Sequence, residues 1–171
     1  DYGPNGLQVE GKAEVHKLVS GVTASRAFIE AAIERKADAV LVHHGLFWRG
    51  QEGTVTGWMR QRLKLLLSHD INVYAYHLPL DAHPLLGNNA QLGRVMGWTE
   101  AETVVSHFGD NNLGALAELA PTDLATLCAT LEHRLKRPVT AVSGANGAIK
   151  KIAWCTGGAQ SYFEAAIAAG A

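Results

Sequence analysis

Histidine and carboxylate side chains gather where two predicted strands end. His43 and His44 close the apolar run 39–42, and His77 and Asp81 follow the next predicted strand. Because open α/β sheets bind ligands beyond the carboxyl ends of their strands, these residues are candidates for one site. Imidazole nitrogen together with carboxylate oxygen suits Zn, Fe, Mn, Co or Ni better than Ca or Mg alone. The residue types therefore predict a divalent metal site, with His43, His44 and Asp81 as ligands.

The adjacency of His43 and His44 constrains the geometry of this site. Neighbouring residues of an extended strand point to opposite faces, so both side chains reach one ion only if the chain turns at Gly45. Two ions about 3.5–4 Å apart, sharing ligands from different walls, are a second solution. The simpler alternatives are a capped strand end for the two histidines and an ordinary turn carboxylate for Asp81. The combination of the two motifs favours metal.

Other polar residues are candidates for supporting the ligands or contacting a substrate. His77 belongs to this group, as does Asn5, which lies with Gln8 in the turn-rich segment 3–9. Asn88 opens a predicted helix whose backbone N–H groups can face an anion. The segment Phe47-Trp48-Arg49 can wall a cleft, although a surface loop and core packing remain the alternatives for these segments.

The elements around these residues predict an α/β fold. Apolar spacing indicates strand, helix and strand in succession, and then a further helix and strand, which is typical of a parallel sheet covered by helices. A loop is expected over 78–86, followed by a helix capped by Asn88 or Asn89 and, further on, a helix capped by Thr122. The predicted strands are 15–22, 39–44, 71–76, 103–106 and 113–119; the predicted helices begin near residues 25, 59, 88 and 122.

An internal repeat suggests that the strand and helix near the start are built twice. The segment 16–19 matches 150–153, and 28–33 matches 162–167, an offset of 134 residues from His16 to Lys150. We therefore expect two related α/β lobes with parallel-rich sheets, the second truncated at the C-terminus. The expected division is a first lobe at 1–98, a connecting region at 99–148 and the start of the second lobe at 149–171.

Composition narrows the possible partners. Fifteen basic and sixteen acidic residues give a net charge of −1, so DNA binding has no support from overall charge, and the cluster Arg60, Arg62 and Lys64 is interpreted as a solvated helix face. Cys128 and Cys155 are expected to be reduced core residues. With no apolar run near the roughly 20 residues needed to span a bilayer, we expect a cytoplasmic protein without membrane contact.

Three motifs together resemble one known family. They are the segment 3–9, Val42-His43-His44-Gly45 with Phe47-Trp48, and 77–81 with Gly87-Asn88-Asn89. The sequence is similar over essentially its whole length to the YbgI-like dinuclear metal-centre hexameric proteins, also called GTP cyclohydrolase I type 2. This resemblance implies a toroidal hexamer with two metal ions per subunit, and it puts His43, His44 and Asp81 on ligand positions. The family's remaining ligands come from a C-terminal His-x-x-x-Glu motif, which lies beyond this sequence.

Two classes of function follow as expectations. The first is a metal-dependent hydrolase of a nucleotide-like substrate, of the GTP cyclohydrolase type or acting on damaged nucleotides. The second is a non-enzymatic hexameric scaffold that binds metal and acts through DNA or protein partners, with a link to the DNA damage response. Fold and two-metal chemistry alone do not select between them.

Overall fold

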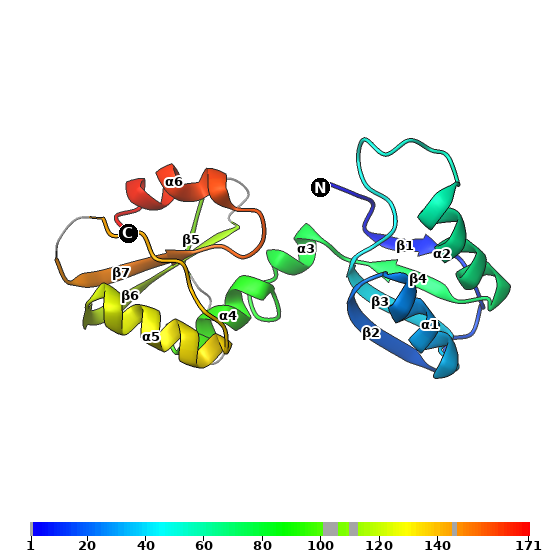
Figure 1. Ribbon diagram of the computed structural model, residues 1–171, viewed down its shortest axis with the longest axis horizontal. Coiled ribbons are helices and arrows are strands. Elements are labelled where there is room, and N and C mark those ends of the chain that lie inside the picture. Colours follow the sequence, from blue (N-terminus) through cyan, green and yellow to red (C-terminus); the bar gives the residue numbers. More distant parts are fainter. Residues whose placement is uncertain (1, 101–105, 110–112, 145–146) are drawn as a thin grey trace. The chain divides into compact units, whose positions relative to one another are not determined.

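The computed structural model describes residues 2–100, 106–109, 113–144 and 147–171. The chain forms two compact units, Asp1–Leu80 and Asp81–Ala171, each with its own sheet (Figure 1). Within the described residues no helix is long and apolar enough to cross a membrane. The predicted division at residues 98 and 148 stays a prediction.

The first unit is built on a four-stranded sheet in the order β1-β4-β3-β2. Strands β2, β3 and β4 are parallel, and β1 joins β4 antiparallel. Helix α1 connects β2 to β3, and α2 connects β3 to β4, which confirms the predicted succession of strands and helices. The bounds are β1 Gly6–Val9, β2 Leu18–Thr23, α1 Arg26–Glu34, β3 Ala39–His44, α2 Gly57–Ser68 and β4 Asn72–Ala75.

The core of the first unit explains why these segments fold as they do. Val40 and Val73 of the central strands are fully buried, and Ile29 of α1 and Leu66 of α2 are fully buried as well. Burying these side chains stabilises the fold by about 25 cal/mol for each Å² of apolar surface removed from water. Ser25 begins α1 by accepting a hydrogen bond from the Phe28 N–H. The carboxyl ends of β3 and β4 are therefore held on a rigid support.

Two local predictions for residues 78–96 were wrong. The expected loop contains a short helix, α3 (Leu78–Asp81), and α4 (Asn88–Met96) is capped by Gly87, without a side-chain cap. Asn88 instead donates a hydrogen bond to Asp81. Asn89 is buried, where its side chain binds the Leu113 carbonyl and the Thr156 N–H. Both amides are thus used in longer-range contacts.

The second unit contains a three-stranded antiparallel sheet, order β5-β6-β7. The α/β class is confirmed, and the parallel arrangement belongs to the first sheet. The repeat's order of strand followed by helix recurs in β7 and α6. The bounds are β5 Ser106–Phe108, β6 Gly114–Thr122, α5 Leu124–Leu135, β7 Ile149–Trp154, the 3-10 turn Gln160–Tyr162 and α6 Phe163–Ala168. Of the strand predicted at 103–106, residues 103–105 lie outside the described residues.

The predicted N-cap of helix α5, Thr122, was wrong. Its N-cap is Asp123, whose carboxylate accepts a hydrogen bond from the Thr126 N–H at 2.7 Å, whereas Thr122 ends β6. This contact and a second one from the Thr126 hydroxyl lower the pKa of Asp123.

Cys128 and Cys155 are free thiols, as expected. Burial raises the pKa of Cys155, which keeps this thiol neutral.

Candidate metal centre

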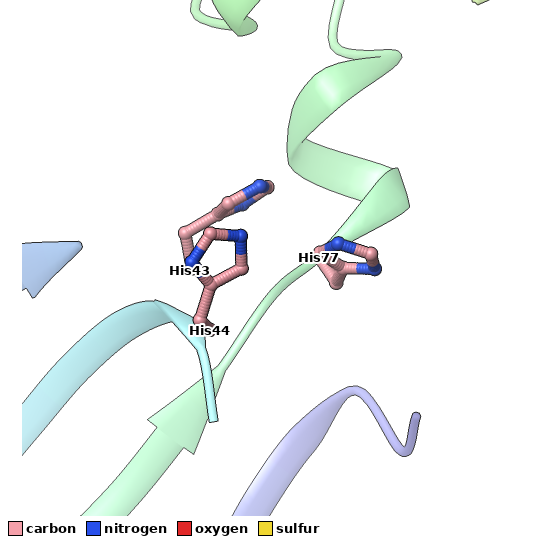
Figure 2. Close-up of side chains that lie close together, drawn as sticks. All are labelled: His43, His44 and His77. Atoms are coloured by element: carbon pink, nitrogen blue, oxygen red, sulfur yellow. The ribbon is translucent and has the colours of Figure 1, made fainter. Parts of the chain in front are cut away.

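Three histidines meet at the carboxyl edge of the first sheet. His43 and His44 end β3, and His77 lies between β4 and α3, so that the three rings face a common space (Figure 2). One nitrogen from each ring lies within 4.8 Å of the others. Zinc binds histidine nitrogens at about 2.0–2.1 Å. From the observed spacing, rotations of the side chains can bring the three nitrogens to this distance from one ion. The cluster can therefore hold a divalent ion.

The two adjacent histidines converge, although strict strand alternation predicts that they diverge. Their ring centroids are 4.6 Å apart, which fits the alternative of a chain that turns after His44. Gly45 permits that turn, because a Cβ there would collide with the Gln8 side-chain oxygen. Gln8 accepts a hydrogen bond from the Leu46 N–H and donates one to the Pro4 carbonyl, both at 2.8 Å. Gln8 thus braces the turn instead of facing a ligand.

A backbone hydrogen bond decides which ring nitrogen of His43 is available to an ion. Its Nδ1 lies 3.0 Å from the Tyr76 carbonyl oxygen. Because a carbonyl oxygen only accepts, Nδ1 carries the proton in the neutral ring, and the lone pair is left on Nε2. Metal-ligating histidines are commonly oriented in this way. The hydrogen bond therefore makes Nε2 the nitrogen of His43 that can face an ion.

His44 and His77 are also held from outside the cluster. The Thr23 hydroxyl lies 3.1 Å from Nδ1 of His44. The backbone N–H of His77 donates to the Asn5 side-chain oxygen at 2.8 Å. Asn5 was predicted to support the ligands or contact a substrate. This hydrogen bond places its side chain against the backbone of His77, and its role in a metal site stays a prediction.

Aromatic residues border the cluster within the first unit. The Trp48 ring centroid is 5.1 Å from that of His77 and 5.9 Å from that of His44. Trp48 also lines a pocket of about 430 Å³ with Phe47, Arg49 and the segment 3–4. The prediction that 47–49 can wall a cleft agrees with this pocket. Sequence reasoning did not foresee that Trp48 contacts the histidines, because no short-range pattern connects them.

Comparison with known proteins places this chain in a family. The family model for Duf34/NIF3 (NGG1p interacting factor 3) matches residues 1–171. The chain belongs to the Duf34/NIF3 family. A Neisseria meningitidis serogroup B relative, named GTP cyclohydrolase 1 type 2 homolog, is 50% identical over 170 residues, which cover 98% of this chain and 66% of the relative. A Pseudomonas aeruginosa relative of the same name is 50% identical over 99% of this chain and 67% of its own length. The chain thus spans about two thirds of these relatives.

Two solved structures share the fold of this chain. Protein ybgI is 46% identical and superposes with a TM-score of 0.88, covering 99% of this chain and 67% of the other. Protein TTHA1606 from Thermus thermophilus is 31% identical with a TM-score of 0.83, covering 96% of this chain and 65% of the other. The resemblance stated from the three motifs is confirmed.

Asp81 and Asn88 belong to the second unit of this Duf34/NIF3 chain. The boundary between the units falls between Leu80 and Asp81. The Asn88 side-chain amide donates to the Asp81 carboxylate at 2.6 Å, which orients that carboxylate. Asp81 as a metal ligand, and Asn88 as its support, stay predictions. His77, by contrast, joins His43 and His44 within the first unit.

Proposed function

We propose that the protein binds divalent metal through His43, His44 and His77, with Asp81 as a further ligand of a two-ion centre, and that it hydrolyses a nucleotide-like substrate. The observation that carries this proposal is the convergence of three imidazoles in which the Nε2 of His43 is selected by the Tyr76 carbonyl. Imidazole nitrogen is a ligand for Zn, Fe, Mn, Co and Ni. Elemental analysis of the purified protein identifies the bound ion.

In this proposal the chain's own residues hold the ion and keep the three histidines in position. His43 is fixed through its Nδ1 proton, His44 is held near the Thr23 hydroxyl, and the backbone of His77 is tied to Asn5. A divalent ion in such a site supplies Lewis acidity and an activated water for hydrolysis. The Trp48 ring borders the cluster and lies in an edge arrangement with the ring of His77.

The substrate class and the assembly are part of the same proposal. The relatives are named GTP cyclohydrolase 1 type 2 homologs, which supports GTP as the first substrate to test. The motif resemblance supports a homohexamer. Sedimentation of the purified protein with and without metal tests that assembly, and a monomer under both conditions would contradict it.

The deciding experiment measures bound metal and turnover on the same preparations. We expect bound divalent metal, GTP consumption that stops with chelator, and loss of both in His43→Ala and His77→Ala. His16→Ala is the matched control, because the His16 side chain is 81% exposed and lies before β2, away from the cluster. This variant should keep metal and activity.

Three outcomes would change the interpretation. Metal retained by His43→Ala and His77→Ala would overturn the site. Metal bound without turnover of GTP or of oxidised nucleotides would favour the non-enzymatic scaffold. Turnover that persists after complete removal of metal would contradict the metal-dependent mechanism.

A further inference from the structure

A groove of about 360 Å³ runs along one side of α2 in the first unit. Helices α1 and α2 lie side by side there (Figure 1). The groove's polar lining residues are Arg26, Arg60, Gln61, Lys64, Ser68 and His69. It shares no residue with the histidine cluster, so it is a separate candidate site.

The spacing of residues along α2 explains the groove. Arg60, Lys64 and Ser68 follow one another at four-residue intervals, so they lie on one face of the helix. Met59 and Leu66 are buried and pack in the core of the unit. The helix therefore turns its apolar side to the sheet and exposes a basic stripe.

The charge of this stripe is not balanced locally. Helix α2 contains three basic residues and no acidic residue, although the whole chain has a net charge of −1. Arg26 is paired with Glu30 at 2.7 Å, whereas within the described part of the chain neither Arg60 nor Lys64 has an ion-pair partner. None of the residues that line the groove carries a carboxylate. The groove thus concentrates positive charge.

Gln61 adds a neutral donor to the same wall. Its side-chain oxygen accepts a hydrogen bond from Arg26 at 3.5 Å, an orientation that leaves the NH₂ group as the donor for a ligand. A guanidinium, an ammonium and an amide together suit phosphate oxygens, since arginine offers paired donors and lysine a point charge.

We propose that this groove binds a small ligand carrying phosphate groups in a row. Arg60 and Lys64 are separated by about 6 Å along the helix axis, which extends the charge along a line. The volume fits a small molecule. The near-neutral chain lacks the broad positive field that a nucleic-acid surface requires. The site is independent of the proposed hydrolase activity.

Arg62 provides a matched control on the same helix. Its guanidinium carbon lies 4.7 Å from the centre of the Trp58 ring, and Arg62 does not line the groove. Arg62→Gln therefore removes the same charge from α2 as Arg60→Gln does, but outside the proposed site. A general effect of charge should weaken ligand binding equally in both variants. If the groove is a specific site, only Arg60→Gln should weaken binding.

The test is calorimetric titration of the purified protein with inorganic tripolyphosphate at low and physiological salt. We expect saturable one-to-one binding that Arg60→Gln and Lys64→Gln each weaken at least threefold, with Arg62→Gln within twofold of wild type. Circular dichroism establishes that each variant is folded.

Four results would overturn the proposal. They are no binding at millimolar tripolyphosphate, an equal loss in Arg62→Gln and Arg60→Gln, orthophosphate binding as tightly as tripolyphosphate, and tighter binding of a single-stranded oligonucleotide whose affinity grows with its length. The last result would identify the groove as a nucleic-acid contact.

Discussion

At the residue scale, the Nδ1 atoms of His43 and His44 each have a contact that orients the ring of a proposed metal ligand. A carbonyl oxygen contacts the first and a hydroxyl contacts the second. The carbonyl belongs to the backbone of Tyr76, so no substitution there removes the contact cleanly. The hydroxyl of Thr23 can be removed without changing the shape of the side chain.

We predict that Thr23→Val lowers metal affinity about 10- to 100-fold, because the outer contact that orients His44 is lost. Valine retains the β-branched shape, so Thr23 on the edge strand β2 should tolerate the change. Competition with a coloured chelator measures the affinity.

Thr23→Ser is the control for this substitution. It restores the hydroxyl and should bring the affinity back to within about threefold of wild type. Equal affinities in wild type and Thr23→Val would show that this hydroxyl does not act on the centre.

At the scale of elements, Asp38 fixes the amino edge of the first sheet. Its carboxylate accepts hydrogen bonds from the Lys12 side chain at 2.7 Å and from the His16 and Lys17 N–H groups at 3.1 and 3.0 Å. Chiefly the Lys12 hydrogen bond, with help from the two backbone donors, lowers the pKa of Asp38 to about 2. This carboxylate thereby connects the entry to β2 with the start of β3.

We predict a loss of stability in acid that depends on Asp38. Because its pKa is lowered on folding, the ionised group stabilises the protein fully above its unfolded pKa of about 3.9, and this contribution disappears as the pH falls towards 2. Urea unfolding from pH 7 to pH 2 measures the effect.

Two variants test the assignment to Asp38. Asp38→Asn should be less stable at pH 7 and should change less between pH 4 and pH 2. Lys12→Gln should show a smaller effect in the same direction. An unaltered pH curve in Asp38→Asn would assign the acid sensitivity to other carboxylates.

At the scale of the whole molecule, the proposed metal centre would link metal binding to folding. The proposed ligands come from β3 and from the segment after β4, so an ion that binds only the folded arrangement would stabilise it. At an ion concentration 100 times Kd the gain is about 2.7 kcal/mol. This gain corresponds to about 5–10 °C in Tm for a chain of this size.

We predict that a chelator lowers the Tm of the metal-loaded protein by this amount and that His77→Ala abolishes the difference. Differential scanning calorimetry measures both. His16→Ala should keep the full shift. An equal response of His77→Ala and wild type to the chelator would assign the bound metal to another part of the protein.

The local sequence pattern was sufficient to predict most strands and helices of the first unit. The apolar spacing predicted β2, α1, β3, α2 and β4, and the placement of histidines at strand ends predicted the edge where three of them meet. Periodicity succeeds here because burial of one face is decided within a few residues of the chain. The helix caps were predicted wrongly because local propensity does not encode distant contacts. Asn88 and Asn89 hydrogen-bond to Asp81 and Leu113, and Thr122 belongs to β6.

Only the tertiary structure decided how the site is assembled. Asn5 reaches His77 across 72 positions, Gln8 braces the turn after His44, and Thr23 contacts His44 from the neighbouring strand. Each contact depends on strand order and register, which arise when distant segments bury a shared core. The sequence by itself predicted histidine and carboxylate side chains at the carboxyl edge of the first sheet, because local pattern decides where strands end. The packing of the sheet decided that His43, His44 and His77 meet, whereas Asp81 as a ligand stays a prediction.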